Sequence, residues 1–466
     1  MTANRLYFGD CLDVMREDIS DSSVDLIYLD PPFNSKRLYN AFIGDAQWVA
    51  FNDTWRWSEA VNDFHDVAKE VRLAKTMEGL RMILGEGPNL AYLAYMANRL
   101  RECARVLKPT GSIYLHCDQT MSHYLKVVLD CIFNRKNFRN EIVWSYNRFS
   151  RRGDTFARMN DTIFFYSLSN RYFFVKPEGV ARNTDRYKKG YHTVSDRGVS
   201  KLLVYDIEKA KHKIESAKAM GREIKYTKAQ RPTMGNVWTD IPIINPQSSE
   251  RTGYPTQKPL ALLQRIIEAS CPPDGIVLDP FCGCGTTIHA AANLQRKWIG
   301  IDVCVNACKV IEKRLRGHFD SVWNNVEFIG MPMTQNDAKT LASLDSFRFE
   351  RWAASLVDGM EHNKIQRGDG GIDGRGRFAI RKGKFIDIVS QVKGGGTGPG
   401  DIQAFNGARQ QAGADLGIFT CFEDRVTQKM RDAAASTGRF METPIIQIYT
   451  IEDYFNDRRP SMPRVA

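Results

Sequence analysis

The sequence predicts an α/β protein, a parallel sheet covered by helices on both faces, followed by a second, smaller α/β domain. Short apolar segments that end in an acid alternate with amphipathic segments before residue 120 and again after residue 258. The pattern fades over residues 316–345, and a second alternation then runs to the end of the sequence. With 466 residues, the chain is long enough for two or three domains with sizeable cores.

The composition is that of a globular protein, with 43% hydrophobic residues. The first residues lack the apolar core of a signal peptide and no apolar run reaches 18 residues, so we expect no membrane segment and a cytoplasmic location. The 10 cysteines are scattered without disulfide spacing, which fits a reducing compartment. The close pairs at 282/284 and 304/308 lack matching histidines, which favours packed thiols over a zinc site.

Positive charge is concentrated in one part of the chain. Residues 134–231 carry 23 Lys and Arg against 10 Asp and Glu, a net of +13, so the rest of the +11 chain is −2. The same segment contains aromatic clusters such as WSYNRFSRR and FFYSLSNRYFF. A basic, aromatic-rich segment in a nearly neutral protein indicates binding to nucleic acid. The alternative is a solvated surface, with residues 208–228 as an exposed helix.

The amino-terminal part alternates strands and helices. Residues 1–30 give strand, turn and strand, and residues 35–90, with a Trp-rich stretch and a Gly-rich break, predict a long loop or lid that carries helices. Apolar residues at helical spacing predict a helix over 91–107, and GSIYLHCD at 111–118 is a buried strand that again ends in an acid. SHYLKVVLDCIF then predicts a helix before the basic segment.

The run LIYLDPPFN at 26–34 joins a buried strand to a rigid turn. Pro31 and Pro32 cannot donate to a sheet and each fixes its own φ, so the chain leaves the strand in a stiff, extended form. Asp30 precedes a proline, which disfavours helical geometry there. The result is a platform that presents one carboxylate and the ring of Phe33 to a flat group with an N–H to donate. A tight turn without chemistry is the alternative reading of this run alone.

A Gly-rich turn lies where an α/β fold places a cofactor. LDPFCGCGTT at 278–287 follows a strand and opens a helix, and Gly283 and Gly285 let the backbone approach a ligand closely. Asp302 ends the next strand, where a carboxylate can bind ribose hydroxyls. GxGxxG is absent from the loop and GxxxxGK[ST] from the chain, which disfavours NAD and an ATP-driven motor. A nucleoside ligand without a pyrophosphate, S-adenosylmethionine, fits; a plain strand-to-helix turn is the alternative.

Taken together, DPPF at 30–33 and DPFCGCGTT at 279–287 resemble the amino-methyltransferases of DNA, which methylate adenine N6 or cytosine N4. Three further stretches match the family: GDCLDVM at 9–15, HCD at 116–118 and YPTQKPLALLQRII at 254–267. DPPF comes first and the Gly-rich loop last, which resembles the beta class, a circularly permuted form of the Rossmann-like methyltransferase fold.

This resemblance covers residues 4–315 and implies a division of the chain. The expected parts are a catalytic domain of residues 1–133 and 246–320, a target-recognition segment at 134–245, a linker at 321–345 and a further domain at 346–466.

The resemblance implies methyl transfer from S-adenosylmethionine to the exocyclic amine of a base flipped out of double-stranded DNA. That amine is a poor nucleophile because its lone pair is delocalised into the ring. Asp30 and the Pro31 carbonyl would accept its hydrogens and turn the lone pair toward the methyl donor, and Phe33 would stack on the base. Asp rather than Ser before Pro-Pro favours adenine, and cytosine stays open.

Cofactor and DNA contacts follow from the same resemblance. Asp10 would contact the cofactor adenine, Asp302 its ribose and Lys258 the methionine carboxylate. The full cofactor set is Asp10, Cys11, Lys258, Asp279, Phe281, Cys282, Gly283, Gly285, Thr286, Thr287 and Asp302, and the expected DNA contacts are Arg148, Arg151, Arg152, Arg158, Lys188 and Lys189.

The carboxyl-terminal part contains the pattern of a metal-dependent nuclease. RFAI and FIDIVSQVK predict a hairpin, with Asp373 just before it and with Gln391 and Lys393 on one face of its second strand. An acid followed by such a pair resembles PD-(D/E)xK nucleases of the Mrr type, in which Mg²⁺ is bound by acidic side chains. The resemblance implies a metal set of Glu350, Asp373 and Gln391, with Lys393 at the attacking water or phosphate. Gln391 replaces the usual acid, so a domain that only binds DNA is the alternative.

The sequence therefore predicts an adenine-N6 DNA methyltransferase fused to an Mg²⁺-dependent endonuclease, a single-chain restriction-modification enzyme of a prokaryote or phage. A cytosine-N4 enzyme, an orphan methyltransferase with a DNA-binding tail, and a methyltransferase for RNA or protein glutamine are the alternatives. The recognition sequence and the oligomeric state stay open, and a homodimer is compatible with this reading.

Overall fold

The computed structural model describes residues 4–34, 38–43, 46–147, 155–177, 189–196, 199–204, 206–226, 234–318, 325–332, 334–357, 360–362, 371–381, 384–456 and 458–463. Among these residues, no helix is both long and apolar enough to cross a membrane.

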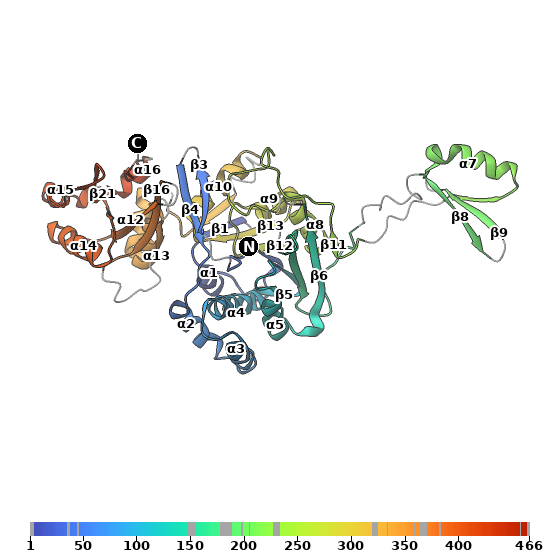
Figure 1. Cartoon of the computed structure of the whole chain (residues 1–466), viewed down its shortest axis with the longest axis horizontal. Helices are drawn as coiled ribbons and strands as arrows, with labels where there is room; N and C mark the ends of the chain where they lie inside the picture. Colours follow the sequence, from blue (N-terminus) through green and yellow to red (C-terminus); the bar gives the residue numbers. More distant parts are fainter. Residues whose placement is uncertain are drawn as a thin grey trace.

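A nine-stranded sheet organises the first three quarters of the chain, in the order β11-β6-β7-β5-β2-β12-β13-β1-β14 (Figure 1). Its strands are β1 (Asn4–Phe8), β2 (Val24–Leu29), β5 (Leu107–Cys117), β6 (Phe138–Ser145), β7 (Asn160–Ser167), β11 (Val237–Trp238), β12 (Ile276–Asp279), β13 (Lys297–Asp302) and β14 (Val326–Ile329). The pairs from β5 through β2, β12, β13 and β1 to β14 are all parallel, and β7 is antiparallel to both of its neighbours. The predicted parallel α/β core is confirmed.

Helices cover both faces of this sheet. The helices α1 (Cys11–Asp18), α4 (Pro88–Val106) and α5 (Ser122–Phe133) contribute to one apolar cluster, and α8 (Leu260–Ser270), α9 (Thr286–Asn293) and α10 (Val305–Arg316) contribute to another. Leu26 and Tyr28 of β2 enter the second cluster, and Ile27 and Leu29 enter the first, because side chains alternate across a strand. Burial of each such aliphatic side chain contributes about 1.5–3 kcal/mol. The two cores therefore hold β2, and the Asp30 that follows it, in a fixed place.

The stretch expected to be a loop or lid with helices contains a hairpin as well. β3 (Leu38–Ile43) pairs antiparallel with β4 (Ala46–Asn52), and α2 (Trp57–Val67) and α3 (Val71–Leu84) follow. The helices agree with the expectation, whereas the hairpin was not anticipated. Its first strand, LYNAFI, lacks the strict alternation that marks a half-buried strand in a sequence.

The basic segment divides into two structural parts. Its first part supplies β6 and β7 to the main sheet, so the boundary placed at residue 134 separates strands that belong to the same sheet as β5. Its second part forms a small unit of β8 (Tyr191–Asp196), β9 (Val199–Val204), α7 (Ile207–Ala219) and β10 (Glu223–Tyr226), with a core of Leu202, Val204, Ala210, Ile214 and Ala217. α7 confirms the helix expected within residues 208–228, and its lysines at 209, 211 and 218 are exposed.

The range 321–345, expected to be a linker, contains regular structure. β14 is the edge strand of the main sheet, where Val326 pairs with Asn4, and α12 (Gln335–Leu344) begins at a capping box on Thr334. The strand was not predicted from the sequence HFDSVWNNVEFIG because it is only four residues long. The chain therefore passes from the main sheet into the next domain through a helix.

The carboxyl-terminal domain has a five-stranded sheet in the order β15-β16-β17-β18-β21, drawn in orange to red in Figure 1. Its elements are α13 (Ser346–Ser355), β15 (Met360–His362), β16 (Gly374–Arg381), β17 (Lys384–Lys393), α14 (Pro399–Gln411), β18 (Leu416–Cys421), α15 (Gln428–Ala435), β19 (Arg439–Phe440), β20 (Thr443–Pro444), β21 (Ile446–Thr450) and α16 (Ile451–Phe455). The predicted hairpin is β16–β17, and the order helix, strands, helix, strand, helix, strand is confirmed.

Candidate active site

A pocket opens at the carboxyl ends of β2, β12 and β13, where ligands bind in open parallel sheets. β2 and β12 are neighbours, so the DPPF run and the Gly-rich loop, which are about 250 residues apart in sequence, lie side by side. The predicted residues that line it are Cys11, Asp30, Pro31, Pro32, Phe33, Lys258, Asp279, Phe281, Cys282, Gly283, Thr286, Thr287 and Asp302. Asp10 and Gly285 belong to the predicted set and are not among the lining residues.

A buried carboxylate, Asp53, anchors the turn after β2. Its oxygens accept hydrogen bonds from the backbone N–H of Phe33 at 3.1 Å and of Asn34 at 2.8 Å. They also accept one from the indole N–H of Trp55 at 3.2 Å. Asn34 has a φ of 59°, a left-handed conformation that asparagine tolerates better than most residues. The rigid platform expected from Asp-Pro-Pro-Phe therefore depends on a carboxylate more than 20 residues downstream of Asp30.

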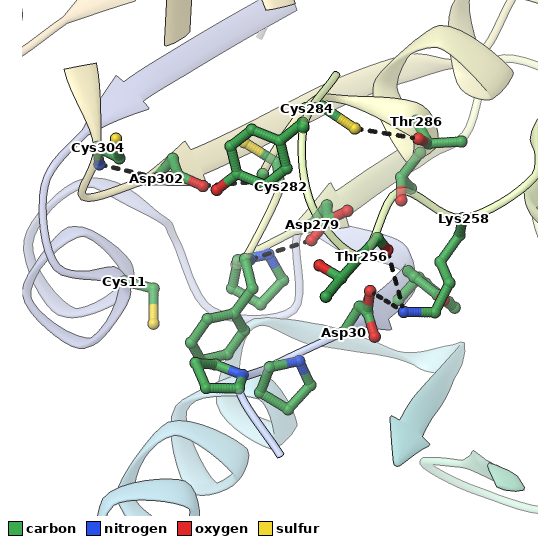
Figure 2. A pocket seen from close by; sticks show the side chains of 18 of the residues that line it. Cys11, Asp30, Thr256, Lys258, Asp279, Cys282, Cys284, Thr286, Asp302 and Cys304 are labelled. Atoms are coloured by element: carbon green, nitrogen blue, oxygen red, sulfur yellow. Dashed lines mark hydrogen bonds and ion pairs between the residues drawn. The ribbon is translucent and has the colours of Figure 1, made fainter. Parts of the chain in front are cut away.

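Asp30, the first residue of the platform, has one paired oxygen and one unpaired oxygen. Its Oδ2 accepts a hydrogen bond from the ammonium of Lys258 at 2.5 Å, and Figure 2 shows the two side chains meeting across the pocket. Its Oδ1 is buried and has no hydrogen-bond partner within the described residues. A buried acceptor of this kind is costly unless a donor satisfies it. Oδ1 is therefore ready to accept an N–H from a ligand.

The ring of Phe33 rests on a buried polar network. The imidazole of His116 stacks against it with the ring centroids 5.9 Å apart. His116 Nδ1 lies 2.9 Å from the hydroxyl of Tyr28, and its Nε2 lies 3.1 Å from Asp161 Oδ2. Burial alone would raise the pKa of Asp161, but the hydrogen bond and charge of His116 and the charge of Lys258 outweigh burial and lower this pKa. An ionised Asp161 only accepts, so the Nε2–H of His116 donates to it.

The Gly-rich loop after β12 has the backbone geometry that only glycine adopts easily. Gly283 and Gly285 have φ values of 49° and 73°, in the left-handed region. A Cβ at Gly285 would lie 2.7 Å from Cγ1 of Ile311, so Gly285 acts by packing the loop onto α10 rather than by lining the pocket. Gly283 faces Tyr254, whose ring carbon would lie 3.3 Å from a Cβ.

The acids at the ends of β12 and β13 have raised pKa values. Asp302 Oδ2 accepts from the Gly283 N–H at 2.7 Å and Oδ1 from the Cys304 N–H at 2.8 Å. Burial raises the pKa of Asp302 to about 6, although these two bonds oppose the shift. Burial likewise raises the pKa of Asp279 to about 7, with Asp30 and Asp302 adding to it. A carboxylate can accept up to four hydrogen bonds, so Asp302 keeps acceptor capacity for a ribose hydroxyl.

Asp10 has a structural role in the free protein. It caps α1 by accepting from the Leu12 N–H at 2.8 Å, and both its oxygens accept from Arg99 Nη2 at 2.7 and 2.8 Å. Burial would raise the pKa of Asp10, but the charge of Arg99 outweighs it and lowers this pKa. The neighbours Gly9 and Cys11 line the pocket, so Asp10 fixes the wall of the site. Contact of Asp10 with the cofactor stays a prediction.

A family model described as DNA methylase matches residues 24–313, more than half of the chain. The chain belongs to the DNA methylase family. The Type II methyltransferase M.EcaI of Enterobacter cloacae is 32% identical over 262 residues, which are 48% of this chain and 57% of that protein. The Type II methyltransferase M.BamHI of Bacillus amyloliquefaciens is 28% identical over 320 residues, 67% of this chain and 57% of that protein. The chain thus spans a little over half the length of these two relatives.

Solved structures also resemble this chain in part. The PvuII DNA methyltransferase, described as cytosine-N4-specific, is 16% identical, and the match covers 71% of this chain and 95% of that chain with a TM-score of 0.38. A TM-score this low carries no argument about the fold, which rests on the strand order described above.

The predicted DNA contacts of the methylase lie only partly within the described residues. Arg158 and Lys189 are exposed, as binding to a phosphate backbone requires. Phe156, two residues before Arg158, has a fully exposed ring, at 100% of its accessible surface. The other predicted contacts, Arg148, Arg151, Arg152 and Lys188, lie outside the described residues.

The hairpin of the second domain brings the predicted nuclease residues together. Asp373 precedes β16, and its N–H donates to the Ser390 carbonyl at 2.9 Å while its Oδ2 accepts from the Val392 N–H at 2.7 Å. Gln391 and Lys393 alternate with Val392 on β17 and so share one face. Gln391 is buried, and its Oε1 has no hydrogen-bond partner within the described residues.

The described residues at this hairpin do not provide the acidic side chains that a metal site requires. The described residues contain no cluster of three or more His, Cys, Asp or Glu side chains that could bind a metal ion. A second family model, described as NACHT-associated inactive Restriction Endonuclease 1, matches residues 347–456. The endonuclease-like part of the prediction agrees with this match, whereas the Mrr type is not supported by it. Glu350 lies on α13, and its part in binding a metal stays a prediction.

Several residues of the site received no role in the sequence analysis, although three of them, Tyr254, Thr256 and Gln257, belong to the quoted stretch YPTQKP. Asp53, Tyr95, Tyr254 and Thr256 line the pocket, and Gln257 braces it by accepting from the Thr252 N–H at 2.8 Å. Asp53 belongs to FNDTW, which drew attention only for its tryptophans. The available signal in the sequence is an acid close to two Trp residues; that Asp53 is buried and which groups it binds can be read only from the fold.

Proposed function

We propose that this methylase transfers a methyl group from S-adenosylmethionine to the exocyclic amine of a base in double-stranded DNA, with adenine N6 as the target and cytosine N4 as the alternative. The observation that carries the proposal is Asp30, which lines a pocket shared with a Gly-rich loop and whose buried Oδ1 has no hydrogen-bond partner within the described residues. Adenine rests on the resemblance, through the Asp that precedes Pro-Pro.

The pocket fits the cofactor on the chemistry of its donor set. Gly283 brings backbone close to a ligand, and Asp302 offers acceptor capacity for ribose hydroxyls at the end of β13. Tyr254 and Phe281 supply apolar ring surface for the adenine. When bound, the cofactor supplies a methyl group on a positively charged sulfur.

The residues of the platform would prepare the amine for attack. Asp30 Oδ1 and the Pro31 carbonyl would accept the two amine hydrogens, which favours a tetrahedral nitrogen whose lone pair faces the methyl carbon. A nitrogen–carbon bond forms as the carbon–sulfur bond breaks, and the surplus proton then leaves the nitrogen for solvent. Phe33, supported by His116, would stack on the flipped base.

The basic segment supports DNA as the substrate. The net charge of +13 over residues 134–231 provides electrostatic attraction to phosphates, and the ring of Phe156 lies exposed beside Arg158. A methyltransferase for protein would not need this charge. RNA is disfavoured by the order of the motifs, which resembles the beta class of DNA enzymes.

The test is methyl transfer from labelled S-adenosylmethionine to double-stranded DNA, RNA and protein, with hydrolysis and mass spectrometry of the DNA nucleosides. We expect label in DNA alone, as N6-methyladenine. Label as N4-methylcytosine would support the alternative base, and label only in RNA or protein would overturn the proposal. Sequencing of DNA from cells that express the protein would then give the recognition site.

For the second domain we propose DNA binding without cleavage, in place of the Mg²⁺-dependent nuclease. Of the three residues Asp373, Gln391 and Lys393, only Asp373 has a carboxylate. The amide of Gln391 contributes no negative charge to a metal site. The nuclease is the second candidate, supported by the shared face of Gln391 and Lys393. Incubation of unmethylated and methylated DNA with Mg²⁺ or Mn²⁺ separates the two, since cutting that Asp373→Ala abolishes would establish the nuclease.

A further inference from the structure

Lys258 lies at the junction of the two halves of the site. Its ammonium nitrogen is 2.5 Å from Asp30 Oδ2, across a sequence separation of 228 residues. The same nitrogen is 5.2 Å from the centroid of the Phe33 ring, which places the cation against the aromatic ring as well. Lys258 is 8% exposed, so its charge sits in a largely dry environment where an ion pair is weakly screened.

The loop that carries Lys258 is built to hold it in place. Gln257 Oε1 accepts from both the N–H and the hydroxyl of Thr252 at 2.8 Å, and Gln257 Nε2 donates to the Glu250 carbonyl at 2.8 Å. Thr256 has a φ of 62°, a left-handed conformation that is unfavourable for a β-branched residue, and its carbonyl accepts from Lys258 Nζ at 3.4 Å. Thr256 and Gln257, the two residues before Lys258 in the run TQKP, thus hold the lysine in place.

This arrangement differs from the role expected for Lys258 at the methionine carboxylate of the cofactor. The ammonium has three donors, and two protein acceptors, Asp30 Oδ2 and the Thr256 carbonyl, take two of them. Asp30 in turn has one oxygen bound to Lys258 and one buried oxygen without a partner within the described residues. Because Lys258 binds Oδ2 of Asp30, Oδ1 is the oxygen that is left to accept a hydrogen bond from the amine.

We propose that Lys258 is a positioning residue for Asp30, which holds Oδ2 so that Oδ1 faces the amine of the target base. This inference rests on the proposed methyl transfer and adds the origin of the orientation of Asp30. Lys258 acts through Asp30 and not by contact with the base. The charge of Lys258 also helps to hold the nearby Asp161 ionised, and so connects the Asp30 pair to the network beneath Phe33.

The test compares full-length wild type with Lys258→Met, Lys258→Gln, Asp30→Asn and the double variant Asp30→Asn/Lys258→Met. S-adenosylmethionine affinity is measured by calorimetry, and methyl transfer is measured in single turnovers with saturating cofactor. We expect Lys258→Met to slow transfer roughly 10- to 100-fold, the effect of losing one charge-assisted hydrogen bond, with cofactor affinity unchanged. Lys258→Gln, which keeps one neutral donor, should lose less.

The double variant separates positioning from a general structural role. If Lys258 acts through Asp30, adding Lys258→Met to Asp30→Asn should slow transfer little further, so the two effects are not additive. Fully additive losses would overturn the proposal. A cofactor affinity that falls at least tenfold in Lys258→Met would assign the lysine to the methionine carboxylate and also overturn it.

Two controls keep the outcomes distinct. If wild type transfers no methyl group to DNA, the proposed function fails, whereas active wild type with unaffected Lys258 variants means that only this inference fails. Melting temperatures show whether each variant folds, and Lys258→Gln carries the comparison if Lys258→Met does not. In that case, unchanged cofactor affinity with slower transfer supports the proposal, and the reverse pattern overturns it.

Discussion

The two domains each place an acid directly beside a strand and next to a polar side chain, but the two sites differ in charge. In the pocket of the first domain, Asp30 has a cationic partner, Lys258, and a buried oxygen that has no hydrogen-bond partner within the described residues. At the β16–β17 hairpin, Asp373 Oδ2 accepts the Val392 N–H, and the neighbouring Gln391 is neutral. The backbone arrangement of a reactive site is thus present in both domains, but in the first the acid is paired with a cation, whereas in the second a neutral amide takes the place of the usual acid.

This difference shows that the position of a side chain on a sheet and its chemical nature can vary independently. A sheet places side chains at adjacent strand ends whatever their chemical nature, so a hairpin can keep the outline of a nuclease after an acid has become an amide. Charge, burial and unpaired acceptors decide whether the outline can act on a substrate.

The largest expected effect is the loss of transfer in Asp30→Asn. Replacing the acceptor oxygen pair with an amide removes the carboxylate that would orient the amine, and we expect transfer to fall roughly 100- to 1,000-fold, as when a preorganised polar group is removed from other active sites. Asp373→Asn, the matched change in the second domain, should leave transfer unchanged. Single-turnover transfer rates for both variants test this contrast, and equal losses would show that the domains are not independent.

Removing the anchor of the platform should have the next largest effect. Asp53→Ala leaves the N–H groups of Phe33 and Asn34 and the Trp55 indole without their acceptor. We expect the free energy of unfolding to fall by about 2 kcal/mol or more, since each buried unsatisfied group costs about 1–3 kcal/mol. Urea unfolding measures this loss, and Asp53→Asn, which keeps one acceptor oxygen, should lose less. A variant Asp53→Ala as stable as wild type would contradict the anchoring role.

The third prediction concerns pH and Asp302, whose pKa is raised by burial to about 6. Protonation would remove the charge that we expect to bind the ribose hydroxyls, so affinity for S-adenosylmethionine should weaken by up to about tenfold per pH unit below about 6. Stability changes in the opposite direction. The unfolded chain releases this proton near pH 4 and the folded chain near pH 6, so the contribution of Asp302 to stability falls as pH rises through that window.

Calorimetric titrations of the cofactor between about pH 5 and 8 test this dependence, with Asp302→Asn as the matched variant. The variant should bind more weakly at neutral pH and lose the dependence on Asp302. A wild-type affinity that stays constant down to about pH 5 would contradict the assignment of this carboxylate to the ribose.

The smallest effect should come from restoring charge to the second domain. Gln391→Glu places a second carboxylate beside Asp373, which should lower stability without metal and create affinity for a divalent cation. We expect Mn²⁺ to raise the melting temperature of this variant by a few degrees, roughly the effect of a weak ligand, and to leave wild type unaffected. An equal Mn²⁺ shift in wild type would mean that the neutral glutamine does not prevent metal binding.

The sequence by itself determined the class of the fold and most of the site. Apolar runs that end in an acid marked β2, β12 and β13, and proline and glycine chemistry marked the turns after two of them. These signals are local, because a buried strand and a left-handed turn each restrict the residues within a few positions. The hairpin that carries Asp373, Gln391 and Lys393 was predictable on the same basis.

Tertiary structure alone decided which of these residues work together. Lys258 is paired with Asp30, Asp53 is bound to the turn after Pro32, and β14 completes the main sheet from a stretch without a clear pattern. Each of these contacts joins residues that are distant in sequence, and its energy comes from burial and from neighbours on other strands. The residues around Lys258 in the sequence would look the same whether the lysine binds a cofactor or pairs with Asp30. The pairing with Asp30 can therefore be read only from the folded structure.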